Sequence, residues 1–392
     1  MALSLGMAAA MAGGCSDEKM TSSAPPVSAT PLDANAFSQL WRGSIAVPAG
    51  DHVTRVIMLG DTVYVYTAGG TVYGLDHDTG VVRFVDVVNS KGHELRPAVA
   101  LNDDNIAYPT ADTLELYSKR SGEFIKSIYV QGRISSDASS DGDVVYLGLD
   151  VGGGHLAQID TDRPYHEVVW QLLLFGQVLG APAAAQNVVF VGSGDGGVRA
   201  ITNDEHSYWF LDHDRFNTGG AIVADIVLDG GNVYAASTIG RLVCLDRRNG
   251  LLRWQYYSNI PLTETPVVTK TMIYEHIDGL GIVALDKVQQ LQLNPGDKHM
   301  IDMKSHTPIW QANGAKAFVS ETDSYAFLID GDGSILAVDK TTGARVYRAP
   351  NTGFAAFATD TRESTIFAAG NDGSVYAFKP TLAPGTPGMM AQ

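Results

Sequence analysis

The sequence has few of the features that mark known classes of enzyme or of nucleic-acid-binding protein. It contains only two cysteines in 392 residues, and no histidine or cysteine spacing typical of a zinc site. The motifs C-x-x-C-H, G-x-S-x-G, H-E-x-x-H and the P-loop are absent from the sequence. Basic residues are also scarce, since 27 Lys and Arg stand against 43 Asp and Glu, a formal net charge of −16. A chain this acidic repels phosphates, which argues against a nucleic-acid partner.

The apolar run at the start of the sequence, residues 1–14, is too short to span a bilayer. This segment is small, apolar and uncharged, which is typical of the apolar part of an export signal. The last three residues of this segment and the next residue form AGGC at 12–15, which resembles the lipobox of bacterial lipoproteins, and this resemblance implies that Cys15 is lipidated. A disordered hydrophobic N-terminus is the alternative. With Cys15 lipidated, Cys244 has no partner for an intramolecular disulfide, and its apolar neighbours indicate a small buried residue.

The polar stretch after Cys15 and the last residues of the chain are poor in groups to bury. We therefore expect a signal segment at 1–14, a flexible tether at 15–36, one folded domain at 37–380 and a disordered tail at 381–392. Only a repeat architecture would make a domain of this length a single unit.

The body of the chain shows such a repeat. An aromatic residue ends a short β-type run at intervals of roughly 40–45 residues. These eight positions are Tyr64, Tyr108, Tyr146, Phe190, Tyr234, Tyr274, Phe327 and Phe367. In six of the eight units a second landmark, most often the Asp of a Leu-Asp pair, follows twelve residues later. Chance alignment of apolar runs does not produce this regularity.

Each unit reads as four strands. A β-rich run, a turn containing glycine and an alternating run predict a hairpin, and a second turn such as DRRNG leads to a strand with a large aromatic residue. Asp with Gly four residues later suits a tight turn, so we interpret these aspartates as turn-formers rather than catalytic acids. Four strands per period predict one propeller blade, and eight units predict an all-β, eight-bladed β-propeller.

The repeat resembles that of the pyrroloquinoline-quinone-like propeller family, whose signature is A-x-D-x-x-T-G-x-x-x-W. The sequences AVDKTTG at 337–343 and CLDRRNGLLRW at 244–254 match it well, and units two to four match poorly. The resemblance covers roughly residues 37–380 and implies the fold of the quinoprotein dehydrogenases.

The two ends of the repeat region suggest how the ring closes. The last unit stops at 374–380 without an outer strand, whereas 37–47 stands alone at the front with Trp41. Pairing the two would complete blade eight and leave no open sheet edge. The five tryptophans then share one role, packing between neighbouring blades. They are Trp41, Trp170, Trp209, Trp254 and Trp310.

The enzymes of the family carry a calcium-bound quinone covered by a disulfide of adjacent cysteines, and this chain has no adjacent cysteines. The sequences DGDGS at 330–334 and DGD at 141–143 look like calcium loops, but neither continues to the spaced acidic ligand of an EF-type site. We interpret both as hairpin turns and expect no cofactor, no metal site and no catalytic residues.

One unit is longer than the others. From Asp286 to Trp310 the chain has 16 residues more than the regular spacing. Long insertions in repeat folds often form binding elements on one face, although a tolerated surface loop is an equal alternative. Met300, Ile301 and Met303 are the candidate interaction residues of this loop.

We therefore expect a non-catalytic, monomeric propeller, exported and lipid-anchored in the cell envelope, that serves as a scaffold for envelope proteins. The combination of blade number, closure and anchor is similar to the propeller lipoproteins of outer-membrane β-barrel assembly machineries, which implies the outer membrane, facing the periplasm. The alternative is a propeller that binds quinone or another small ligand in its channel, possibly as a relative of the quinone-dependent dehydrogenases. Convergent carboxylates and an aromatic floor at the channel mouth would favour the ligand, and small apolar side chains would favour the scaffold.

Overall fold

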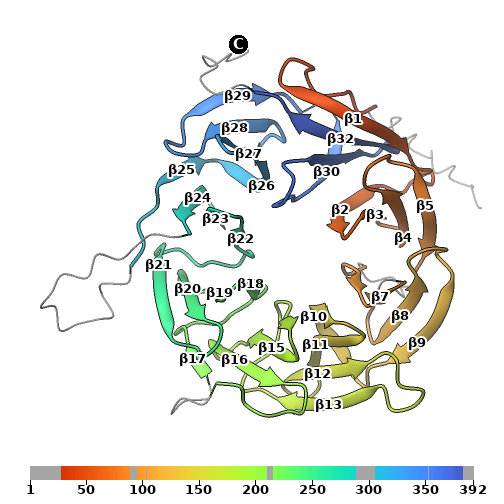
Figure 1. Cartoon of the computed structure of the whole chain (residues 1–392), viewed down its shortest axis with the longest axis vertical. Helices are drawn as coiled ribbons and strands as arrows, with labels where there is room; N and C mark the ends of the chain where they lie inside the picture. Colours follow the sequence, from red (N-terminus) through yellow and green to blue (C-terminus); the bar gives the residue numbers. More distant parts are fainter. Residues whose placement is uncertain are drawn as a thin grey trace, which may run out of the picture.

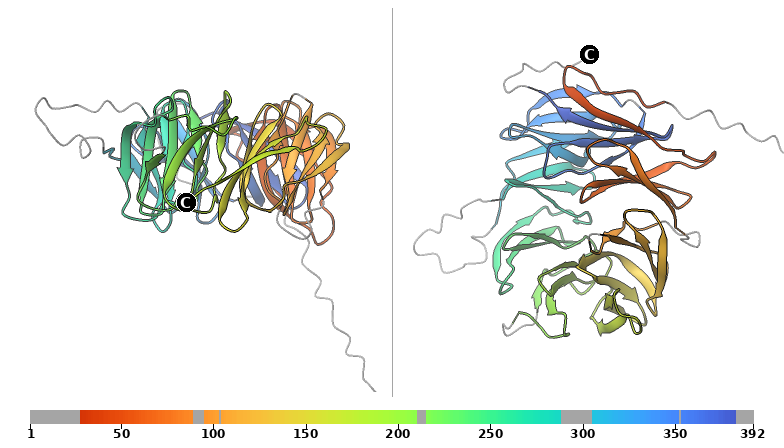
Figure 2. Two further views of the ribbon diagram at one scale, coloured as in Figure 1. Left: turned by 90° about the horizontal axis from the view of Figure 1, so that it is seen from below. Right: turned by 45° about the vertical axis from the view of Figure 1, so that its right-hand side comes forward.

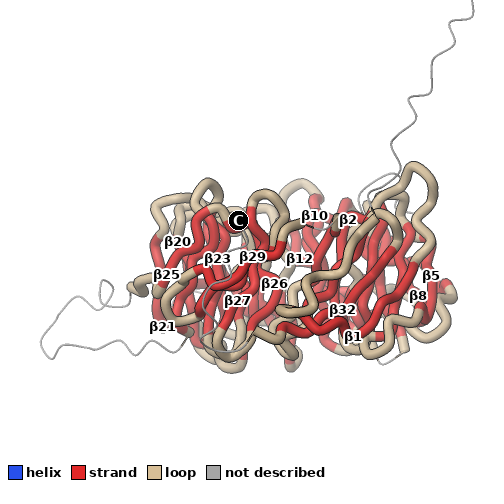
Figure 3. The backbone as a smooth tube through the Cα atoms, turned by 90° about the horizontal axis from the view of Figure 1, so that it is seen from above, coloured by secondary structure: helices blue, strands red, loops and turns tan. Residues whose placement is uncertain are grey.

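The structure, a computed structural model, describes residues 28–88, 95–102, 104–209, 215–287, 305–351 and 353–382. Within these ranges the chain forms eight antiparallel sheets of four strands each. The sheets stand around a common axis (Figure 1), and the side views show that together they make one flat disc (Figures 2 and 3). The chain is therefore an all-β, eight-bladed β-propeller, which confirms the fold class predicted from the repeats.

Seven blades use four strands that are consecutive in the chain. Blade 1 contains β2 (Val53–Leu59), β3 (Thr62–Thr67), β4 (Thr71–Asp76) and β5 (Val82–Val87). Blade 2 contains β6 (Val99–Ala100), β7 (Asn105–Pro109), β8 (Thr113–Ser118) and β9 (Phe124–Tyr129). Blade 3 contains β10 (Arg133–Asp141), β11 (Val144–Asp150), β12 (Gly154–Asp160) and β13 (Val168–Leu173). Blade 4 contains β14 (Ala183–Ala185), β15 (Val188–Gly192), β16 (Gly197–Thr202) and β17 (Arg215–Asn217).

The second half of the ring repeats this order. Blade 5 contains β18 (Val227–Asp229), β19 (Asn232–Ser237), β20 (Arg241–Asp246) and β21 (Leu252–Tyr257). Blade 6 contains β22 (Val267–Val268), β23 (Met272–Ile277), β24 (Gly281–Asp286) and β25 (Trp310–Asn313). Blade 7 contains β26 (Ala315–Glu321), β27 (Tyr325–Asp330), β28 (Ile335–Asp339) and β29 (Arg345–Ala349). In each blade the first strand lies nearest the axis and the last lies at the rim (Figure 1).

Blade 8 is built from both ends of the chain. It combines β30 (Phe354–Ala358), β31 (Ile366–Gly370) and β32 (Ser374–Pro380) with β1 (Phe37–Ser44) as its outermost strand. β1 runs antiparallel to β32, with Trp41 opposite Ala377 and Arg42 opposite Tyr376. This pairing confirms the predicted closure, because a strand from the start of the repeat region completes the last blade.

The core lies within and between the blades. The eight aromatic residues that mark the repeat all lie on the second strand of their blades, and each is 0–1% exposed. The apolar clusters join neighbouring sheets. One of them contains Cys244 and Trp254 of blade 5 together with Ile273 and Val283 of blade 6. Each blade therefore buries its faces against two neighbours, as expected for stacked repeats. Cys244 is a free, buried cysteine, and burial raises the pKa of its thiol to about 12.

The segment just before β1 is packed on the propeller. Ala29, Leu32 and Ala36 are nearly buried and belong to the cluster between blades 7 and 8. The Ser28 hydroxyl and the Ala29 amide donate hydrogen bonds to Asp372, at 2.9 and 3.1 Å. Residues 28–36, part of the span expected to be a tether, thus lie against the disc.

Candidate functional site

The site residues predicted from the sequence lie outside the described residues. Cys15 precedes residue 28, and Met300, Ile301 and Met303 fall within 288–304. The described ends of the long insertion both contact blade 5. Lys287 Nζ lies 2.6 Å from Asp229 Oδ2, and the His306 amide donates to the Gln255 carbonyl over 2.6 Å. The described ends of the insertion therefore contact blade 5 at two places, the end of its innermost strand β18 and its outermost strand β21.

The repeated aspartates form turns. The Asp339 Oδ1 atom accepts hydrogen bonds from the amides of Thr341 and Thr342 at 3.0 and 2.9 Å. Four residues on, the Gly343 amide donates to the Asp339 carbonyl, with φ +70°. The hydrogen bonds from Thr341 and Thr342 hold the pKa of Asp339 below its usual value, although desolvation opposes them. Because such a carboxylate accepts hydrogen bonds from the amides of its own turn, its role is to stabilise the turn.

The two calcium-like stretches are hairpin turns, as the sequence suggested. DGDGS joins β27 to β28, where the Ser334 amide donates to Asp332 Oδ1 over 3.0 Å. DGD joins β10 to β11, and its Asp141 and Asp143 accept hydrogen bonds from Asn187 of blade 4 and Asn102 of blade 2. The described residues contain no group of three or more His, Cys, Asp or Glu that could hold a metal ion.

The tryptophans pack between blades, which confirms their predicted role. Four of them donate a hydrogen bond from Nε1 to a backbone carbonyl of the next blade. These donors are Trp41, Trp170, Trp209 and Trp310, with distances of 2.7–3.1 Å. The fifth, Trp254, packs against His306 of blade 6 with ring centroids 4.3 Å apart.

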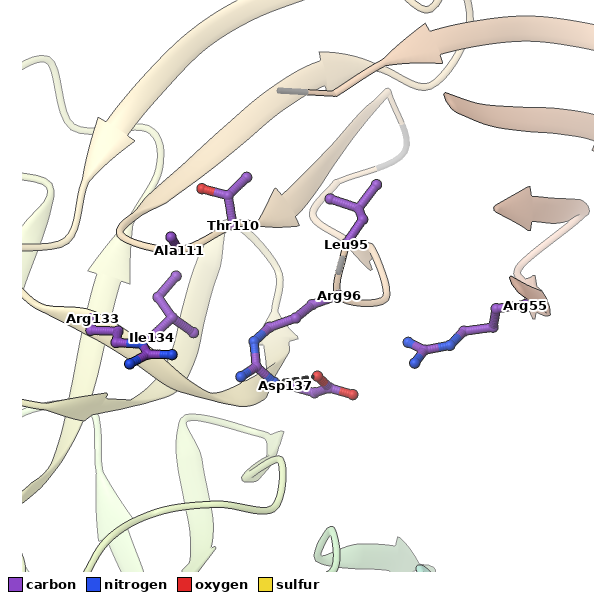
Figure 4. Close-up of a pocket in the computed structure, with 8 residues that line it drawn as sticks. All are labelled: Arg55, Leu95, Arg96, Thr110, Ala111, Arg133, Ile134 and Asp137. Atoms are coloured by element: carbon purple, nitrogen blue, oxygen red, sulfur yellow. Dashed lines mark hydrogen bonds and ion pairs between the residues drawn. The ribbon is translucent and has the colours of Figure 1, made fainter. Parts of the chain in front are cut away.

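The feature that stands apart from this repeated scaffold is a cavity of about 260 Å³ at the mouth of the central channel. Its lining comes from blades 1, 2 and 3, at the end of the channel where their first strands begin. The residues drawn in Figure 4 are Arg55, Leu95, Arg96, Thr110, Ala111, Arg133, Ile134 and Asp137. Figure 4 shows Arg96 and Arg133 on one side of the opening and Arg55 reaching toward them from the other.

The charges at this mouth are mainly positive. Arg96 Nη1 lies 2.8 Å from Asp137 Oδ1, and both side chains are about one-third exposed. Within the described part of the chain, Arg133 has no side-chain hydrogen bond or ion pair. A further carboxyl, Asp225 of blade 5, lies near enough to feel the charges of Asp137 and Arg55. Burial raises the pKa of Asp225, and its carboxylate accepts a 2.7 Å hydrogen bond from the Ala181 amide.

A second cavity of about 200 Å³ adjoins the first and shares Arg96, Arg133 and Ile134 with it. Leu179, Gln177 and Asp150 complete its rim.

Exposed apolar side chains lie next to this rim, at the end of β13, on the connection from β13 to β14 and on the β11–β12 loop. We call this group, Val151, Leu173, Phe175 and Leu179, the blade 3 patch; its members are 38%, 60%, 82% and 42% exposed, respectively. Leu173 and Val151 lie against Gly153 and Gly132 of the same blade.

The lining of the mouth matches neither arrangement expected from the sequence. It has neither convergent carboxylates over an aromatic floor nor a plug of small apolar residues. What it offers is a set of guanidinium groups, which donate hydrogen bonds to oxyanions. The sequence did contain a signal, because Arg55, Arg96 and Arg133 are each about one repeat apart, just before or within the first strand of a blade.

The sequence did not predict the blade 3 patch, because its residues resemble the ordinary end of a strand. The run QLLLFGQVLG at 171–180 contains apolar residues without a regular spacing, and periodicity does not separate its buried members from its exposed ones. Leu174 is 4% exposed, whereas Leu173 and Phe175 on either side of it point outward. No helix among the described residues is long and apolar enough to cross a membrane.

Comparison with known proteins shows which families and solved structures this chain resembles. The family model described as outer membrane protein assembly factor BamB matches residues 110–258 and 206–292. The crystal structure of BamB from Moraxella catarrhalis superposes with a TM-score of 0.64 at 15% identity, covering 88% of this chain and 97% of that one. The computationally designed Ika8 protein gives a TM-score of 0.59 at 16% identity, covering 87% of this chain and 99% of that one. No curated protein sequence matches significantly.

Structural similarity at such low sequence identity shows that the fold is shared, and a shared fold alone does not specify function. The repeats and the superposition nevertheless agree with each other. The chain is a β-propeller of pyrroloquinoline-quinone-like repeats, similar in those repeats and in fold to the outer membrane protein assembly factor BamB.

Proposed function

We propose that this protein is a non-catalytic scaffold of the cell envelope that holds partner proteins during outer-membrane protein assembly. In this proposal Cys15 carries a lipid anchor in the outer membrane, the disc faces the periplasm, and the protein is a monomer. The likeness to BamB in repeats and fold supports the cellular setting.

The observation that carries the proposal is the blade 3 patch. Single exposed apolar residues are normal on a protein surface, but a group of them beside polar residues is typical of a contact site. Leu173 ends β13, Phe175 and Leu179 belong to the connection that follows it, and Val151 lies on the β11–β12 loop at the same end of the blade. Because the ring is closed and its blades share their cores, this connection is presented on a rigid support.

The packed segment 28–36 also supports the proposal, because it fixes where an anchored chain would leave the disc. Between Cys15 and Ser28 a fully extended backbone spans at most about 45 Å. A lipid at Cys15 would hold blades 7 and 8 within that distance of the membrane. This restriction raises the effective concentration of the disc near partners in the same membrane.

The test is co-purification of the full-length protein from its own membranes after mild crosslinking. We expect Leu173→Asp and Leu179→Asp each to reduce the recovered partner at least tenfold, since hot-spot residues contribute about 2 kcal/mol or more. Tyr165→Asp is the matched control, because Tyr165 is 79% exposed but lies in the β12–β13 loop at the opposite end of blade 3.

A second arm tests the anchor. Cys15→Ala should move the protein from the membrane fraction to the soluble fraction without changing its thermal unfolding. Equal recovery of partner with the patch variants and wild type would contradict the scaffold role. So would tight uptake of a quinone by the purified protein in the absence of any bound partner.

A further inference from the structure

The arginine-lined mouth differs in charge from the rest of the molecule. Over the whole chain acidic residues exceed basic ones by 43 to 27. Among the residues that line the two adjoining cavities the balance is reversed, with three arginines, Arg55, Arg96 and Arg133, against Asp137 and Asp150. The carboxyl of Asp225 behind them is buried, and burial raises its pKa. A concave site of one sign within a surface of the other attracts a ligand group of opposite charge. The lining of this mouth therefore favours a ligand group of negative charge.

The arrangement also favours an oxyanion that is held from two sides. Arg133 begins β10, and Arg96 comes from the connection that leads into β6 of the neighbouring blade. Both line the two cavities, and the Arg133 side chain forms no hydrogen bond or ion pair within the part of the chain that the structure describes. Planar guanidinium groups match the two oxygens of a carboxylate, which they bind in a bidentate manner.

The size of the cavities limits the ligand. Sites for drug-sized molecules usually have volumes of roughly 300–1,000 Å³, whereas these two measure about 260 and 200 Å³. Each suits a single side chain or a group of similar size. The second cavity is bounded by Leu179, which also belongs to the blade 3 patch. A polypeptide lying across the patch would place its neighbouring side chains at the arginines.

We infer that the channel mouth binds acidic side chains of an extended polypeptide segment, with Arg96 and Arg133 as the carboxylate-binding residues and the blade 3 patch receiving adjacent apolar side chains. This inference rests on the proposed scaffold function and specifies the chemistry of the partner. Asp137 orients the Arg96 guanidinium through their 2.8 Å ion pair. Arg55 adds positive charge from the far side of the opening (Figure 4).

The experiment uses the full mature chain and synthetic probes. The first probe is a capped hexapeptide of alternating glutamate and leucine, and the second replaces each glutamate by glutamine. Binding is measured by fluorescence anisotropy at low and moderate salt. We expect the glutamate peptide to bind at least tenfold more tightly than the glutamine peptide, and to weaken as salt rises.

The variants locate the site. Arg133→Ala and Arg96→Ala should each weaken the glutamate peptide about tenfold and leave the glutamine peptide unchanged. Arg133→Lys should restore part of the affinity, because a lysine keeps the charge and loses the bidentate geometry. Arg120→Ala is the control, since Arg120 is 84% exposed, pairs with Asp104 and lies at the opposite end of blade 2. Thermal unfolding of each variant establishes that the ring is intact.

Three results would overturn the inference. They are equal binding of the two peptides, an equal effect of Arg120→Ala, and saturable binding of citrate or inorganic phosphate by a protein that does not bind the glutamate peptide. The last result would assign the arginines to a free anion. Failure of the scaffold role is separate, because it is measured by partner recovery with Leu173→Asp while the two arginines remain in place.

Discussion

At the scale of the residue, the clearest departure from ordinary behaviour is a buried carboxyl. Asp86 lies on β5 of blade 1 and is only 1% exposed. Burial raises its pKa to about 7, although a 2.7 Å hydrogen bond from the Tyr108 hydroxyl of blade 2 favours the ionised form. In the unfolded chain this carboxyl titrates near 3.8. Folding therefore disfavours the ionised form, and the contribution of Asp86 to the stability of the ring falls as pH rises between these two values.

This gives a pH-dependent prediction for Asp86→Asn. The amide stays uncharged and can still accept the hydrogen bond from Tyr108. Relative to wild type, the free energy of unfolding of the variant should increase by about 1.4 kcal/mol per pH unit between pH 4 and pH 7. Above pH 7 the gain should level off, since wild-type Asp86 is then ionised in both states. Urea unfolding at pH 4, 5.5, 7 and 8 measures it, and a difference that does not change with pH would contradict it.

At the scale of the element, the contacts between blades depend on glycines under the tryptophans. Gly250 ends the turn between β20 and β21, with φ +71°. A Cβ atom there would stand 2.7 Å from Cδ2 of Trp209, whose Nε1 donates a 3.1 Å hydrogen bond to the Arg247 carbonyl. Gly80 and Gly343 occupy the same place under Trp41 and Trp310. The turn and the blade interface thus require the same residue.

A comparison of Gly250→Ala with Gly142→Ala separates the effect of the positive φ from the effect of the close contact with Trp209. Gly142 has φ +65° but no atom within 4 Å of its added Cβ. Both variants carry the cost of a left-handed alanine, about 1 kcal/mol. Gly250→Ala should lose a further 1–3 kcal/mol or so through overpacking against Trp209. Chemical unfolding checks the difference, and equal losses in the two variants would show that the tryptophan accommodates the methyl group without cost.

The repeat made most of these elements predictable, and the limits of that prediction have physical causes. The eight aromatic residues, the turn aspartates and the pairing of β1 with β32 follow from local patterns that recur along the chain. The channel mouth does not, because Arg55, Arg96 and Arg133 meet only through the curvature of three blades. The packing of Ala29, Leu32 and Ala36 was missed because small apolar residues in a polar stretch do not show a strand period.

At the scale of the whole molecule, stability depends on how the ring is closed. Trp41 of β1 is 7% exposed and belongs to the apolar cluster that joins blade 8 to blade 1. It also donates its 2.7 Å hydrogen bond to His77 of blade 1. One side chain thus links the strand that completes the last sheet to the first sheet.

We expect Trp41→Ala to destabilise the entire ring by about 3–5 kcal/mol, as for other buried aromatic residues. The adjacent Leu40 is 54% exposed, so Leu40→Ala should lower the free energy of unfolding by less than about 0.5 kcal/mol. Unfolding is followed by far-UV circular dichroism and by tryptophan fluorescence, and the two signals should shift together in a single transition. A separate early transition of small amplitude in Trp41→Ala would mean that blade 8 opens by itself.

The pairing of β1 with β32 also sets an order of events during synthesis. The first strand of the propeller leaves the ribosome before the other thirty-one described strands, and its partner leaves last. Until then both edges are open to any other extended chain nearby, which is the situation that favours misassembly. The final fold is therefore reached only after the complete polypeptide has been released, and a nascent chain stalled before Ser374 cannot seal itself.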